Sequence, residues 1–111
     1  MKSVYKEEYK ERKECYEVYY SLGMAYFKTD IDKAYTYMNT TLELAGKIYG
    51  KSSVESARSY LAIGRIYKAL GDPYNAKNNF KVAREIVKVK ANQEKLLSEI
   101  ENELEYYLLP Y

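Results

Sequence analysis

Few residues of this sequence could carry catalytic or metal chemistry. The chain has no histidine, and Cys15 is its single cysteine, so it lacks an imidazole base and a cysteine-based metal site. Glu14 and Glu17 flank Cys15, and their negative charges disfavour the reactive thiolate. We therefore expect Cys15 to be a small residue near a helix interface.

Two short motifs imitate ligand sites. Residues 50–52 (Gly-Lys-Ser) match the end of a phosphate-binding loop, but that loop needs a preceding strand and a glycine where the sequence has Ala45. Asp30 and Asp32 could contact a cation, although an Asp in such a turn usually caps a helix. The sequence therefore predicts no enzyme, no cofactor and no metal site.

Composition indicates one helical domain spanning residues 1–111. The formal charge is +2 with 31% charged residues, so the chain as a whole is not a polyanion binder, and its 15 tyrosines are typical of a folded protein. The N-terminal residues 1–13 are charged throughout, unlike a signal peptide, and no apolar run could span a bilayer. We expect no membrane insertion and a reducing, cytoplasmic location.

The stretch of residues 60–83 has the spacing of two helices that pack together. Apolar residues recur at steps of three and four on each side of a turn: Ile63, Tyr67 and Leu70, then Ala76, Phe80, Ala83 and Val87. Gly64 lacks a Cβ, which lets a partner helix approach closely. Ala76 and Ala83 supply the matching small surface.

The turn between these helices combines a stop signal with a start signal. Gly71 suits the left-handed residue that ends a helix. Asp72 can cap the next helix, and Pro73 fits its first turn, where no backbone N–H is needed. Because stop and start are adjacent, we expect an antiparallel helical hairpin.

An earlier segment repeats this pattern. The spacing of Tyr60, Ile63, Gly64 and Tyr67 recurs in Tyr19, Leu22, Gly23 and Tyr26. After a turn at residues 29–30, the positions of Ala76, Phe80 and Ala83 are taken by Ala34, Met38 and Thr41. We expect a first helix over residues 2–28 and a second that runs to Tyr49 and ends at Gly50.

Together the two segments resemble tetratricopeptide repeats, helix–turn–helix units that bury one face by stacking on copies of themselves. The resemblance covers roughly residues 16–92 and implies an all-α superhelix, with repeat 1 at about 16–49 and repeat 2 at about 57–91. Gly23 and Gly64 are farther apart than the usual period of about 34 residues. The long second helix and its Gly-Lys loop resemble the kinesin-light-chain type of repeat.

The remaining helix boundaries follow from local signals. Ser52 and Glu55 have the spacing of a capping box for the third helix. The fourth helix should run from Pro73 to residue 90 or 91, and Asn92 suits the left-handed position after it.

A fifth helix over residues 93–108 should cap the stack. Its apolar stripe consists of Leu96, Leu97, Ile100, Leu104 and Leu108. Its other side is acidic and should face water: Glu99, Glu101, Glu103 and Glu105. One sealing face and one solvated face are what a terminal helix of a repeat stack needs.

The resemblance also implies a concave groove lined by the first helix of each pair. Residues just off the packing stripe would face it: Glu17, Tyr20, Met24, Phe27 and Lys28, then Arg58, Leu61, Arg65 and Lys68. Arginine suits carboxylates, and Tyr20, Met24 and Phe27 suit an aromatic or apolar anchor. The leading hypothesis is an adaptor that binds an acidic or aromatic segment of another protein. The competing interpretation is a solvated helix face.

Two other functions are open. A basic stripe on the fourth helix could bind nucleic acid or another polyanion: Lys77, Lys81, Arg84 and Lys88. We prefer to interpret the stripe as a solvated outer face, so nucleic acid is an unfavoured partner. The chain could also be the peptide-sensing fragment of a bacterial regulator.

The first helix overhangs its expected partner and suggests self-association. Val4, Tyr5 and Tyr9 form an apolar stripe that a two-repeat arrangement leaves uncovered. We expect a two-fold homodimer with the first helices antiparallel. Alternatively, the second helix or residues 106–111 fold back over the stripe.

Overall fold

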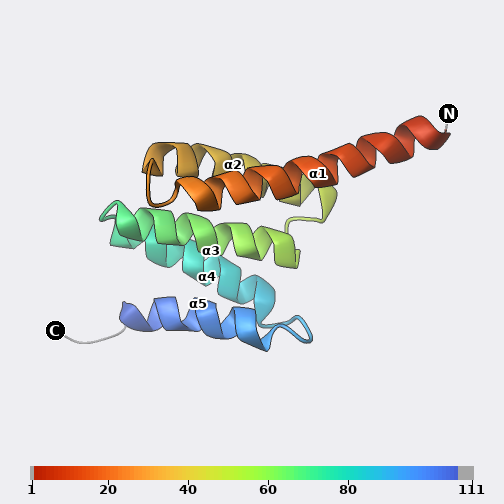
Figure 1. Ribbon diagram of the computed structural model, residues 1–111. Helices are drawn as coiled ribbons and strands as arrows, with labels where there is room; N and C mark the ends of the chain where they lie inside the picture. The colour runs from red at the N-terminus through yellow and green to blue at the C-terminus, as the bar shows by residue number, and fades with distance from the viewer. Residues whose placement is uncertain (1, 108–111) are drawn as a thin grey trace.

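The computed structural model describes the backbone of residues 2–107 and the side chains of residues 12–107. This part of the chain contains no strand, and its helices are α1 (Lys2–Tyr26), α2 (Ile31–Ile48), α3 (Val54–Ala69), α4 (Pro73–Val87) and α5 (Glu94–Tyr106). The predicted all-α arrangement of two hairpins and a closing helix is confirmed. Figure 1 shows the hairpin α1/α2, the hairpin α3/α4 and α5 stacked in chain order, with α1 projecting beyond α2.

Three caps position the starts of the helices. The Asp30 and Asp72 side chains accept backbone N–H bonds at the starts of α2 and α4, so the expected capping is confirmed at both residues. The predicted capping box at Ser52 is wrong, because α3 begins one residue later. Ser53 is its N-cap and accepts a bond from the backbone N–H of Ser56.

Left-handed residues follow the C-caps of α2 and α3, as predicted, whereas the left-handed Asn92 precedes α5 and does not end α4. Their φ angles are 106° at Gly50, 77° at Gly71 and 61° at Asn92. The predicted end of the fourth helix at residue 90 or 91 is wrong: α4 ends at Val87, and turns lead on to Asn92. Helix α1 ends two residues before the expected boundary, and the predicted Leu108 contact lies outside the described residues.

The hairpins α1/α2 and α3/α4 are closed by the same kind of contact. A Cβ added to Gly64 would lie 2.5 Å from Cε1 of Phe80, and one added to Gly23 would lie 2.7 Å from Cε of Met38. Each glycine therefore lets its helix approach a large side chain of the following helix, as the repeated spacing predicted.

The core consists of two clusters that meet at α3. One joins α3, α4 and α5: Ala57, Leu61, Ala76, Phe80, Ala83, Val87, Ile100 and Leu104. The other joins α2 and α3: Ala34, Met38, Ala62, Ile63 and Ile66. Leu70, expected in the apolar stripe, is instead 49% exposed as the C-cap residue of α3.

A pair of tyrosines links the two hairpins. The hydroxyls of Tyr35 on α2 and Tyr67 on α3 lie 2.8 Å apart. This hydrogen bond raises the pKa of Tyr67 to about 12 and lowers the pKa of Tyr35. The two hydroxyls therefore form one hydrogen-bonded pair that titrates as a unit.

Candidate interaction groove

A hollow of about 490 Å³ lies between α1, α3 and α5. It is lined by Tyr20, Met24, Val54, Arg58, Leu61, Ala62, Arg65, Gln93, Lys95, Leu96 and Glu99. The structure thus brings together five of the predicted groove residues: Tyr20, Met24, Arg58, Leu61 and Arg65. We call this hollow the charged groove.

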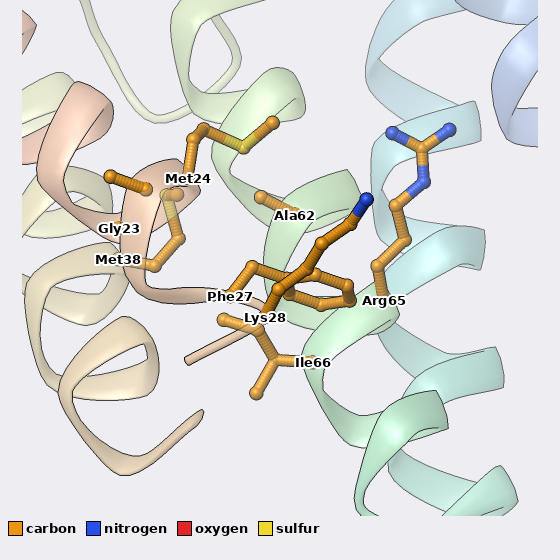
Figure 2. Close-up of a pocket in the computed structure, with 9 residues that line it drawn as sticks. Gly23, Met24, Phe27, Lys28, Met38, Ala62, Arg65 and Ile66 are labelled. Atoms are coloured by element: carbon orange, nitrogen blue, oxygen red, sulfur yellow. The ribbon is translucent and has the colours of Figure 1, made fainter. Parts of the chain in front are cut away.

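A second hollow of about 290 Å³ adjoins it, and we call it the apolar pocket. Its lining is Gly23, Met24, Ala25, Phe27, Lys28, Met38, Ala62, Arg65 and Ile66. In Figure 2, Met24 extends toward α3, Lys28 crosses the Phe27 ring, and Arg65 extends away from the ring. The charged groove and the apolar pocket share Met24, Ala62 and Arg65, so they form one continuous depression.

Arg58 is an accessible cation of the charged groove. Its guanidinium carbon lies 5.0 Å from the centroid of the Tyr20 ring, a cation–π contact. Burial lowers the pKa of Arg58, but Tyr20, Tyr16 and Glu17 raise it by more, so the net shift is upward. Within the described residues Arg58 forms no ion pair, which leaves its charge available to a ligand.

Arg65 and Lys68 are differently placed, because both bind α5. Arg65 Nε donates to Glu103 Oε2 at 2.6 Å, and Lys68 Nζ donates to Glu103 Oε1 at 2.9 Å. Burial raises the pKa of Glu103, but the two hydrogen bonds outweigh it and the net shift is downward. Lys68 lines neither hollow. The expectation that Glu103 faces water is wrong, since α5 turns it toward α3.

The comparison with known families agrees with this geometry. The tetratricopeptide repeat family profile matches residues 14–88, which span most of both hairpins. The chain belongs to the tetratricopeptide repeat family. No curated protein and no solved structure matches it. Repeats of this family are non-catalytic scaffolds that bind other proteins.

The tetratricopeptide groove contains residues that sequence reasoning missed. Lys95, Leu96 and Glu99 come from α5, which was expected only to seal the stack. The signal that could have revealed this role is the position of α5 in the chain. Helix α5 follows the second repeat in the same way as α3 follows the first. A helix in that position contributes one edge to the groove. Leu61, in contrast, is only 4% exposed, so it belongs mainly to the core.

The basic stripe on α4 is not gathered into one hollow of the repeat domain. Lys81 lies beside Val82 and Glu85, whereas Arg84 lies with Glu101 and Glu105 in a different hollow. Lys88 forms an ion pair with Glu85, and Lys77 is half-buried. Polyanion binding through this stripe stays a prediction.

Three other predicted features have different outcomes. Cys15 is exposed, so its expected place near a helix interface is wrong. The side chains of Val4, Tyr5 and Tyr9 lie outside the described residues, and the homodimer stays a prediction. Helices in the described part of the repeat protein are too short or too polar to cross a membrane.

Proposed function

We propose that this tetratricopeptide repeat domain binds an extended segment of another protein through the continuous depression. The bound segment carries an acidic group, which contacts Arg58, and an aromatic or large apolar side chain, which enters the apolar pocket. The observation that carries this proposal is the adjacency of the two hollows, which share Met24, Ala62 and Arg65. A segment lying along them would contact both ends at once.

The apolar pocket supplies the anchor. Met38 and Ile66 at its base are buried, while Phe27 is half-buried and Met24 is 48% exposed. An exposed methionine beside a concave apolar surface adapts to different side chains. Anchors of protein interfaces are typically aromatic groups that fill such pockets.

The charged groove supplies the polar contact. Arg58 is held over Tyr20, and Lys95 approaches from α5. Arginine's planar fork can bind a carboxylate with two hydrogen bonds. Because Arg65 and Lys68 already bind Glu103, Arg58 is the groove arginine whose charge remains for the partner.

Fluorescence anisotropy with labelled peptides tests the proposal. Peptides with a phenylalanine near an aspartate or glutamate are compared with peptides in which the acid is replaced by its amide. Arg58→Gln should weaken binding of the acidic peptides about tenfold, because a charge-assisted hydrogen bond is lost. Lys81→Gln on α4 makes the same change in net charge outside the groove and should leave affinity unchanged.

Two results would count against this function. One is that no acidic or aromatic peptide binds the wild-type chain at micromolar concentration. The other is that Arg58→Gln and Lys81→Gln behave alike. Retention on heparin that falls steeply with salt, and is lost in Lys81→Gln, would favour the polyanion alternative instead. The regulator-fragment hypothesis and the cytoplasmic location stay predictions.

A further inference from the structure

Helix α5 places two carboxylates against the cationic side of the depression. Glu103 binds Arg65 and Lys68 at 2.6 and 2.9 Å, and its side chain is only 16% exposed. Glu99 lies 4.0 Å from Arg65 Nη2, lines the charged groove itself and is 42% exposed. Arg65 borders both hollows, so these carboxylates act at the middle of the depression.

The charge available to a ligand therefore changes along the depression. At one end Arg58 has no ion pair within the described structure. In the middle, the positive charge of Arg65 is matched by Glu99 and Glu103. A ligand carboxylate beside Arg65 would have to break the bond to Glu103 or lie close to the carboxylate of Glu99. Both outcomes cost free energy, because like charges in contact repel and a displaced carboxylate loses its partners.

We propose that Glu99 and Glu103 determine which charge pattern the depression accepts. They admit a segment with one acidic group at the Arg58 end, and they reject a segment that carries a second acidic group beside Arg65. Discrimination of this kind uses a repulsive contact against the wrong ligand. The inference rests on the proposed function, since it concerns the ligand of the same depression.

A merely structural role of Glu103 makes a different prediction. If Glu103 only fastens α5 to α3, its replacement lowers stability and weakens all ligands alike. If it selects ligands, its replacement changes the ratio of two affinities. Glu99 separates the two cases further, because it is more exposed and has only one distant ion-pair contact, so its loss should hardly affect folding.

The experiment compares two peptides of equal length. The first has an acidic residue, a glutamine and a phenylalanine in that order, and the second has glutamate in place of the glutamine. Affinities are measured for the wild type, Glu99→Gln and Glu103→Gln. Glu101→Gln is the matched control, because Glu101 lies beside Arg84 in a separate hollow on α5. Thermal denaturation of each variant shows whether it is folded.

The wild type should bind the one-acid peptide about tenfold more tightly than the two-acid peptide. Glu99→Gln and Glu103→Gln should reduce this ratio toward one or reverse it, while Glu101→Gln keeps it. If the wild type binds the one-acid peptide but neither groove variant changes the ratio, the inference is overturned and the proposed function stands. If neither the wild type nor the groove variants bind either peptide, both are overturned. Should Glu103→Gln fail to fold, the ratio for Glu99→Gln decides.

Discussion

The hairpins α1/α2 and α3/α4 share a packing design but differ in what covers them. Within the described residues, α3/α4 lies between α2 and α5, whereas α1/α2 packs on α3 at one side. The difference shows in α3, where most of the central residues are buried: Ser56, Ala57, Ser59, Leu61, Ala62, Ile63, Gly64 and Ile66. Over residues 12–26 of α1, only Tyr16 and Gly23 are buried.

Tyrosines occupy the less covered hairpin. The Tyr37 ring stacks on Tyr19 and Tyr26, with centroids 5.8 and 5.7 Å apart, and Tyr16 meets the edge of Tyr49 at 5.4 Å. A tyrosine buries apolar area while its hydroxyl can stay in water. The comparison teaches that an inner repeat can use aliphatic residues, whereas an end repeat needs side chains that tolerate both environments.

The largest effect should come from removing the large residue that faces each glycine. Phe80→Ala should lower the free energy of unfolding by about 3–5 kcal/mol and Met38→Ala by about 2–3 kcal/mol, because a buried aromatic leaves the larger cavity. Urea denaturation followed by circular dichroism measures both. Equal losses would contradict the expectation that the larger buried side chain leaves the costlier cavity.

Adding a methyl group at each glycine sharpens the same comparison. Gly64→Ala would place its Cβ 2.5 to 3.1 Å from three atoms of the Phe80 ring, a rigid and fully buried group. We expect a loss of about 2 kcal/mol from overpacking. Gly23→Ala meets the flexible end of Met38 and gains helix propensity of about 1 kcal/mol, so its net effect should be near zero. A larger loss for Gly23→Ala would contradict this.

The ion pairs that join α5 to α3 and the ion pair within α2 should differ in their contribution to stability. Glu103→Gln should lower the free energy of unfolding by about 1.5 kcal/mol at pH 7, because Glu103 is mostly buried and binds two cations. The pKa of Glu103 is lower in the folded state, so this stabilisation is present above the unfolded pKa of about 4.3 and is lost as pH falls through the folded pKa.

The control for this pair is Glu43 on α2. Its ion pair with Lys47 is exposed on both sides, so Glu43→Gln should change stability by less than about 0.5 kcal/mol. The measurement is denaturation of the wild type and both variants from pH 3 to pH 7. A difference between wild type and Glu103→Gln that persists unchanged at pH 3 would rule out the carboxylate charge as its cause.

The smallest effect should be a gain in the less covered hairpin. Tyr16 is 1% exposed, its hydroxyl has no hydrogen-bond partner among the side chains of residues 12–107, and burial holds its pKa well above the usual value. A buried hydroxyl without a hydrogen-bond partner costs desolvation free energy. Tyr16→Phe removes this cost and is expected to raise the free energy of unfolding by about 1 kcal/mol. Tyr19→Phe, at a half-buried position on the same helix, should be neutral. A thermal melt in which Tyr16→Phe lowers the midpoint would show that this hydroxyl has a partner in solution.

The sequence by itself determined the features that depend on neighbouring residues. Gly71 with Asp72, Gly50 and Asn92 act through their own backbone conformation or a bond a few residues away, so their roles were readable from type and order. The residue spacing around Gly23 recurs around Gly64, and this repeat predicted a close helix contact at each glycine. Helix identity, the hairpins and the family follow from such local and periodic signals.

Only the tertiary structure decided how the charges are distributed in the depression. Glu103 meets Arg65 across 38 residues, and that contact depends on the rotation of α5 about its axis and its position along α3. Every exposed face of α5 carries acidic residues, so the sequence pattern could not distinguish Glu103 from Glu101. An ion pair forms between the charges that lie close together in the folded protein. For Glu103 this depends on the position of α5, which is set by the apolar contacts of Ile100 and Leu104.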